Sequence, residues 1–420
     1  MRSTASTSFG IFLLVFFVDL VLPISPVSDT IWNVPTTISV LKTGNFDLDE
    51  YPDLIAERSG YAIRNSNGHL YNYFPVGVSI LAIPQVFLLM QINGTREILR
   101  HVSEAERFIA ASWTALAALF LFQALRGRYD LRTALSFSLL FAFCTRVLST
   151  ASRALWQQTG LLLVNSILLR IFTGELRAKR DYFLLGALCG FALWIRPTSV
   201  LVSVCLFFGV LKTKPKESLR ILMAAIPFLL AFLAFNWDLY DSTLPPYYRE
   251  DGERIFTFST FAEAFLGHWI SPSRGLLVWS PFLILSFFGM FSAVRDKGPI
   301  QAVLSASILL HLLVISGFDS WWGGHSVGPR LWTETIPFLI WFAARGYEDF
   351  FSSFRNSTSL RRIWIFLCIL SLTFHLRASV DPGPSLWNRF PKDVDSDPNR
   401  VWDWKDPQFL RGDHSIRLFL

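Results

Sequence analysis

Cysteine and charged residues are scarce in this chain of 420 residues. Only four cysteines occur, with no CxxC pair, and each lies inside an apolar run, so they resemble small core side chains more than metal ligands. Charged residues make up 17% of the chain and hydrophobic residues 52%, with a mean hydropathy of +0.40. A soluble domain would not stay in solution with this balance. The sequence therefore predicts a protein whose solvent is mostly lipid.

Several motifs of soluble enzymes are also missing. The chain has no GxSxG, no HExxH and no glycine-rich phosphate loop, and it shows no internal repeat or low-complexity tract. Its formal net charge of +6 might suggest a nucleic-acid partner. However, Lys and Arg occur in short runs between apolar segments, which is typical of cytoplasmic loops, so we expect no nucleic-acid binding.

The apolar stretches predict an all-α integral membrane protein with about eleven transmembrane helices. A helix needs about 20 mostly apolar residues to cross the hydrocarbon. Asp19 interrupts the first stretch and no convincing cleavage site follows it, so we interpret it as a helix and not as a signal peptide. The predicted spans lie near residues 10–26, 107–125, 133–149, 156–173, 182–195, 197–211, 220–238, 275–294, 299–317, 330–346 and 363–379.

The distribution of basic residues predicts a cytoplasmic N-terminus. With that orientation nearly all basic clusters fall on one side, as the positive-inside tendency requires. The apolar stretch 74–92, with Pro75, Gly77 and Pro84, must then not cross, and is better interpreted as a re-entrant or interfacial helix. We expect one polytopic domain over 1–379 and an extracytoplasmic tail over 380–420. The predicted outer loops are 27–106, 239–274 and 318–329.

Asp29 follows the first predicted span, at the point where the chain leaves the membrane. A partly desolvated carboxylate has a raised pKa and can act as a general base toward an incoming hydroxyl. The alternative is an ordinary helix-end Asp in contact with water.

The first outer loop contains an acidic group and an aromatic group. Asp47, Asp49, Glu50 and Asp53 could hold a divalent cation, but they lack the fuller oxygen set of known loop motifs, so a solvated acidic loop is favoured and no metal is expected. His69, Tyr71 and Tyr73 have the composition of a surface on which a sugar ring stacks, and equally that of an interfacial aromatic belt.

Three arginines lie where predicted spans meet the outer surface. Arg196 joins two apolar half-spans, and an arginine at such a position is suited to a lipid phosphate, with snorkelling to the surface as the alternative. Arg274 lies in GHWISPSRGLLVWSP and Arg330 in DSWWGGHSVGPRL. The second segment also carries Trp322 and His325 beside glycines that let the backbone approach a ligand closely. Function is favoured over simple membrane anchoring for both segments.

These features together resemble the GT-C superfamily of polytopic glycosyltransferases that use lipid-linked sugars, in particular protein O-mannosyltransferases and the aminoarabinose transferase of lipid A. The resemblance covers about residues 10–345. It rests on Asp29, on HLYNYFPVG in the first loop, on GFALWIRP around Arg196, and on the two segments SPSRGLLVWSP and WWGGHSVGPRL. It implies a helical bundle with interfacial helices in the first loop.

The resemblance implies Asp29 as the catalytic base and Arg196, Arg274 and Arg330 as ligands of the donor phosphate. The expected reaction is inverting transfer of a sugar from a polyprenyl-phosphate donor to a glycan, lipid or protein acceptor on the extracytoplasmic face of a membrane, most simply a bacterial inner membrane. Many relatives carry Asp-Glu where this chain has Asp29-Thr30. A transporter or flippase of a lipid-linked glycan and a non-catalytic assembly subunit remain as alternatives.

Overall fold

The computed structural model describes residues 2–23, 27–58, 60–174, 178–248, 256–296, 298–354 and 357–412. Four parts of the predicted spans, outer loops and tail therefore lie outside the described residues: 24–26 of the first span, 59 and 249–255 of two outer loops, and 413–420 of the tail.

Five helical segments are long and apolar enough to cross a membrane. They are α6 (Val102–Arg126), Leu131–Ser149, α12 (Pro215–Tyr240), α16 (Pro299–Ser316) and α18 (Thr358–Val380). Shorter apolar helices occur at Ala5–Val21, Gly77–Asn93, Pro197–Thr213 and Pro281–Ala293. Large apolar side chains such as Met223, Leu230, Phe366 and Ile369 point outward from α12 and α18. Such surfaces are stable in lipid and costly in water, so a multi-pass membrane protein fits this structure.

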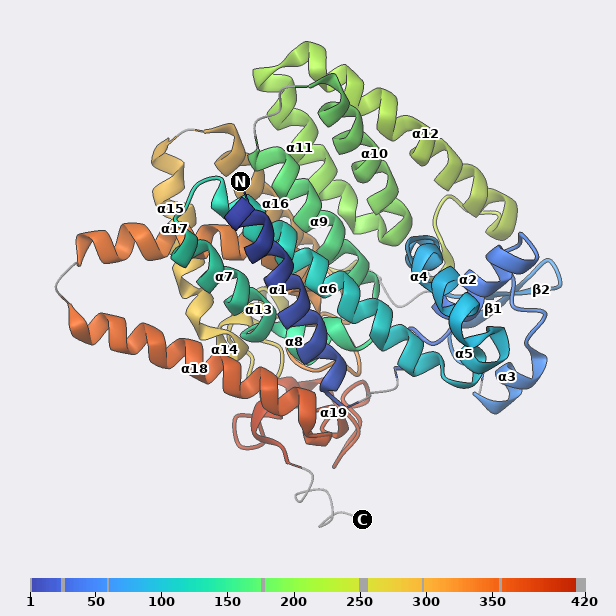
Figure 1. Ribbon diagram of the computed structural model, residues 1–420. Helices are drawn as coiled ribbons and strands as arrows, with labels where there is room; N and C mark the ends of the chain where they lie inside the picture. Colours follow the sequence, from blue (N-terminus) through green and yellow to red (C-terminus); the bar gives the residue numbers. More distant parts are fainter. Residues whose placement is uncertain are drawn as a thin grey trace.

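Each predicted span falls on a helical segment. The remaining helices of the bundle are α1 (Arg2–Val21), α7 (Leu131–Phe143), α8 (Arg146–Ser149), α9 (Gln157–Thr173), α10 (Lys179–Ile195), α11 (Val200–Thr213), α13 (Phe261–Ile270), α14 (Leu276–Trp279), α15 (Ile284–Asp296) and α17 (Ile336–Ser353). Helix α6 packs between α1 and α9, α10 packs on α12, and α15 packs on α17 (Figure 1).

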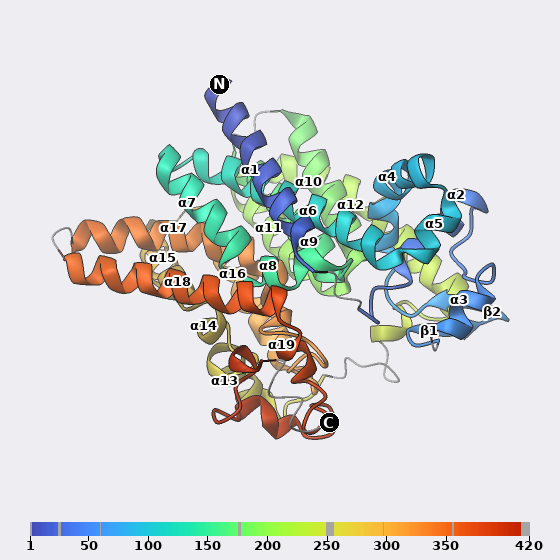
Figure 2. The same ribbon diagram turned by 60° about the horizontal axis from the view of Figure 1, so that its bottom comes forward.

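The predicted first outer loop, residues 27–106, forms a separate group of small elements at one side of the bundle (Figures 1 and 2). It contains α2 (Asn33–Lys42), α3 (Pro52–Glu57), β1 (Ile63–Ser66), β2 (His69–Asn72), α4 (Gly77–Asn93) and α5 (Thr95–Arg100). The apolar stretch 74–92, which was predicted not to cross the membrane, forms α4. Its 17 residues are roughly 25 Å long, which is less than the hydrocarbon thickness.

The antiparallel hairpin β1–β2 corrects the all-α prediction. Its two-residue turn is Asn67-Gly68, and both residues have positive φ, 54° and 89°. Asn-Gly is the commonest sequence for such a turn because both residues tolerate the left-handed backbone region. The sequence therefore carried a signal for this hairpin.

Several helices break at one end of the bundle. Helix α7 ends at Phe143 and is followed by the short helix α8, a single turn at Ala151–Arg153 precedes α9, and Arg330–Thr335 is a 3-10 turn before α17. The C-terminal segment, residues 381–412 with α19 (Gly383–Leu386), folds against α13 and α14 at the same end (Figure 2). These irregular segments leave polar backbone and side chains where a site can form.

Candidate functional site

A cavity of about 1240 Å³ lies where the broken helix ends meet the C-terminal segment. Its lining residues come from five parts of the chain: Pro23 with residues 27–29, Tyr61, and the segments 149–156, 319–330 and 378–395. The cavity is thus built from residues separated by more than 300 positions in the sequence, and the bundle brings them together.

Asp29 and Arg330 form an ion pair in this cavity. Asp29 Oδ2 lies 2.9 Å from Arg330 Nη2, and the Tyr61 hydroxyl donates to Asp29 Oδ1 at 3.3 Å. The guanidinium of Arg330 also lies over the Trp156 ring, 4.2 Å from its centroid. The carboxylate predicted to be a base is therefore positioned by a cation and a phenol, and its side chain is 23% exposed, so it stays accessible from the cavity.

Five residues that line the cavity carry buried polar atoms without a hydrogen-bond partner among the described residues. These atoms are Thr150 Oγ1, Arg153 Nη1, Trp156 Nε1, Ser326 Oγ and Arg330 Nε. Three of them are N–H donors and two are hydroxyls, and unpaired buried donors are costly. Donors of this kind suit an anionic ligand with several oxygens.

Trp322 and His325 also line the cavity and face the C-terminal segment. The Trp322 indole N–H donates to Asp395 Oδ1 at 2.7 Å, and His325 Nε2 lies 2.9 Å from Asp393 Oδ2. The C-terminal segment was expected only to be an extracytoplasmic tail, and its sequence carries no recognisable motif. In the structure it borders one side of the cavity.

Arg196 does not line the cavity. Its Nη1 is ion-paired with Glu334, both side chains are almost completely buried, and its Nε donates to the Tyr248 hydroxyl at 3.3 Å. A buried arginine that already has a carboxylate partner is unavailable to a lipid phosphate without breaking this pair. The predicted role in donor binding is not supported by this placement.

Arg274 does not itself line the cavity, and its guanidinium is already hydrogen-bonded within the protein. It donates to the carbonyls of Trp322 (2.7 Å) and Gly324 (3.1 Å) and to the side chains of Gln408 (2.7 Å) and Asn388 (2.8 Å). Its guanidinium therefore fastens the C-terminal segment to loop 318–329. A phosphate would have to displace these bonds, so only Arg330 of the three predicted arginines is placed at the cavity.

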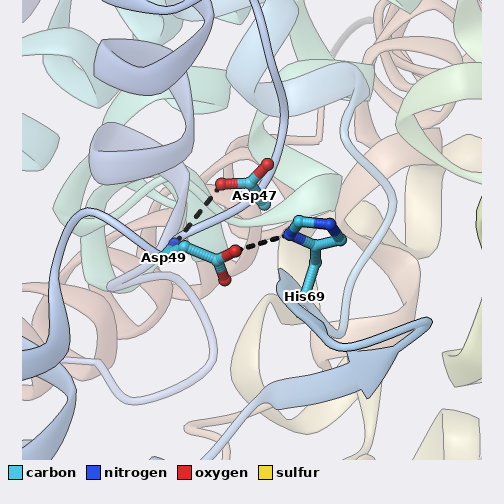
Figure 3. A group of neighbouring side chains, drawn as sticks. All are labelled: Asp47, Asp49 and His69. Carbon is cyan, nitrogen blue, oxygen red and sulfur yellow. Dashed lines mark hydrogen bonds and ion pairs between the residues drawn. The ribbon is translucent and has the colours of Figure 1, made fainter.

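His69, Tyr71 and Tyr73 lie on and beside the hairpin and do not line the cavity. Tyr73 is buried against Tyr247. His69 Nδ1 donates to Asp49 Oδ2 at 2.6 Å, and Asp47 lies beside them (Figure 3). The hydrogen bond to Asp49, and then its negative charge, raise the pKa of His69 above its ordinary value.

Several cavity residues were missed at the sequence level. Tyr61, Trp156, Arg389 and Asp395 line the cavity, but none belongs to a motif, and Arg389 and Asp395 lie in a tail without recognisable pattern. The only available signal was the unusual density of Trp, Asp and Arg in that tail, which is too polar for a membrane segment and too aromatic for a solvated one.

Comparisons with known proteins do not assign this chain to a family. No protein-family model matches the chain, and no curated protein matches it. The resemblance to lipid-linked glycosyltransferases therefore rests on the quoted sequence segments alone.

Proposed function

We propose that the chain is a membrane glycosyltransferase that moves a sugar from a polyprenyl-phosphate donor to an acceptor hydroxyl on the extracytoplasmic face. The observation that carries the proposal is one cavity lined both by the Asp29 carboxylate and by residues with unpaired polar atoms, Arg153 and Arg330 among them. Inverting transfer needs both a base for the acceptor and donors for the departing phosphate.

Asp29 is the base in this proposal. The acceptor oxygen attacks the anomeric carbon from the face opposite the phosphate, and the new carbon–oxygen bond forms as the bond to the phosphate oxygen breaks. The acceptor proton passes to Asp29, and the bonding electrons leave with the polyprenyl phosphate. Attack from the opposite face inverts the anomeric configuration.

Arg330 and Arg153 receive the phosphate. Arg330 is paired with Asp29, and a bound phosphate would compete for the same guanidinium and free the carboxylate for the acceptor. Arg153 also lines the cavity and is buried, and its Nη1 has no hydrogen-bond partner among the described residues. Arg196 and Arg274, which the resemblance assigned to the phosphate, are left with structural roles.

The test is release of labelled sugar from polyprenyl-phosphate donors by purified protein, across a panel of sugars and with membrane extracts as acceptors. We expect Asp29→Asn to abolish turnover, because the amide cannot accept the acceptor proton, and to leave the thermal unfolding temperature in detergent close to that of wild type. The matched control is Asp53→Asn, an exposed carboxylate at the start of α3, which should retain wild-type turnover.

Turnover that survives Asp29→Asn would refute Asp29 as the base and move the search to the acidic group of the first loop. Failure of the wild-type protein with every donor and acceptor would count against a transferase and favour a transporter of the lipid-linked glycan.

A further inference from the structure

A second group of side chains at the cavity has the composition of a metal site. His325 comes from loop 318–329, and Asp393 and Asp395 come from the C-terminal segment. His325 Nε2 lies 2.9 Å from Asp393 Oδ2 and 3.5 Å from Asp395 Oδ2, and the three potential ligand atoms lie within 4.8 Å of one another. His325 and Asp395 also line the cavity.

The distances in this group suit a small divalent cation. Zinc binds imidazole nitrogen and carboxylate oxygen at about 2.0–2.2 Å in tetrahedral geometry, which separates neighbouring ligand atoms by roughly 3.3 Å. The two separations from His325 Nε2 fall on either side of that value. The two distances from His325 are therefore close to those between ligand atoms around a bound zinc ion.

The arrangement of charges also favours a cation. Two carboxylate oxygens face one imidazole nitrogen, which has at most one hydrogen to donate, and carboxylates this close repel each other. Their other oxygens are already used: Asp395 Oδ1 accepts from Trp322 Nε1 at 2.7 Å, and Asp393 Oδ1 accepts from the Asp395 N–H at 2.9 Å. These bonds hold the ligands in place from outside, as is usual around bound metals.

A similar group in the first loop is more tightly closed. His69 Nδ1 lies 2.6 Å from Asp49 Oδ2 (Figure 3), closer than the 2.9 Å between His325 Nε2 and Asp393 Oδ2, so an ion would have to push these two side chains further apart. Asp49 Oδ1 accepts from the Leu70 N–H at 2.8 Å. This group is a hydrogen-bonded pair beside a carboxylate, and it serves as the matched control.

We propose that His325, Asp393 and Asp395 bind a divalent cation of the zinc type at the rim of the cavity. Three protein ligands leave one coordination position open, and the open position faces the cavity that His325 and Asp395 line. There it takes a water or an oxygen of the molecule bound in the cavity. The ion also joins the C-terminal segment to loop 318–329, two parts of the chain that are far apart in sequence.

The first test is zinc binding by the metal-free, full-length protein in detergent, measured by titration calorimetry and by metal content after desalting. We expect one zinc per wild-type chain. Trp322→Phe, which removes the hydrogen bond that orients Asp395, should weaken binding by about 10–100-fold, and His325→Ala or Asp393→Asn should weaken it further. The control His69→Ala should bind zinc as tightly as wild type.

The second readout is limited trypsin digestion, which needs neither sugar donor nor turnover. Zinc should slow cleavage after Arg389 and Lys392 in wild type and in His69→Ala, and should have no effect in His325→Ala. Cooperative thermal unfolding of every variant without zinc should show that the substitutions leave the fold intact.

Zinc bound by His325→Ala as tightly as by wild type would overturn the proposal, as would loss of zinc in His69→Ala or no binding by wild type. If His325→Ala fails to fold, Asp393→Asn and Trp322→Phe decide the outcome in the same way. Because these measurements do not involve sugar transfer, their failure leaves the proposed transferase activity untouched, and failure of that activity leaves the metal site untouched.

Discussion

Four arginines of this chain differ in role because the groups around them differ. Arg330 shares the cavity with Asp29, and Arg153 lies on its wall with an unpaired nitrogen. Arg196 and Arg274 are fixed by buried acceptors. A guanidinium has five donors and no alternative to its charge, so its role follows from which acceptors already surround it.

The Arg196–Glu334 pair is expected to be structural. Glu334→Gln leaves Arg196 as a buried cation without a charged partner, which should lower the free energy of unfolding by roughly 3–5 kcal/mol. The double variant Arg196→Gln/Glu334→Gln should recover part of this loss, because it removes both charges. Thermal and denaturant unfolding in detergent measure the effect. Equal stability of Glu334→Gln and wild type would show that the charge pair is not needed.

The His69–Asp49 pair gives a pH dependence that can be measured directly. Because Asp49 raises the pKa of His69, the pair stabilises the hairpin fully below the ordinary histidine pKa, about 6.5. Its contribution disappears as the pH rises through the raised pKa of the folded protein. NMR of protein with isotope-labelled histidine should show His69 titrating above the ordinary value, and Asp49→Asn should move the midpoint down. A midpoint unchanged by Asp49→Asn would exclude Asp49 as the cause.

At the scale of elements, glycine permits the closest helix contacts. Helices α15 and α17 approach at Gly289 and Gly346, where a Cβ atom would collide with the carbonyl oxygens of Phe342 and Leu285. Small residues at crossing points let helix backbones pack closely in lipid, where the hydrophobic effect does not drive helices together. This contact fixes α17, which follows the turn that carries Arg330.

Alanine at Gly346 should therefore destabilise the bundle. Overpacking of this kind typically costs about 1–3 kcal/mol, and the thermal unfolding temperature of Gly346→Ala should fall accordingly. The matched control is Gly10→Ala in α1, where no atom lies within 4 Å of the added methyl group and alanine is the better helix former. A Gly346→Ala protein as stable as wild type would show that the two helices can move apart without cost.

At the scale of the whole molecule, the proposed function requires that the cavity open to the extracytoplasmic side. The C-terminal segment, which contains Lys405, borders the cavity. Lys212 lies in the last turn of α11, at the start of a predicted cytoplasmic loop. Five predicted spans separate Lys212 from Lys405. An odd number of crossings places the two residues on opposite sides of the membrane.

This orientation predicts the labelling of two exposed positions in intact cells. A membrane-impermeant maleimide should label Lys405→Cys without treatment and Lys212→Cys only after permeabilisation. The wild-type protein is the control, because Cys144, Cys189 and Cys205 are buried and Cys368 is half-buried. Labelling of both variants from the same side would contradict the predicted number of spans, and the reverse pattern would invert the orientation.

The sequence by itself determined the membrane class, the positions of the apolar helices and the location of Asp29 after the first of them, because hydropathy and charge bias are local properties of the chain. The hairpin could also have been predicted from the turn sequence Asn67-Gly68. Only the tertiary structure decided that Asp29 is ion-paired with Arg330 and Glu334 with Arg196, and that the C-terminal segment borders the cavity. These contacts join residues more than 60 positions apart, and they follow from how the helices pack, which no local pattern records.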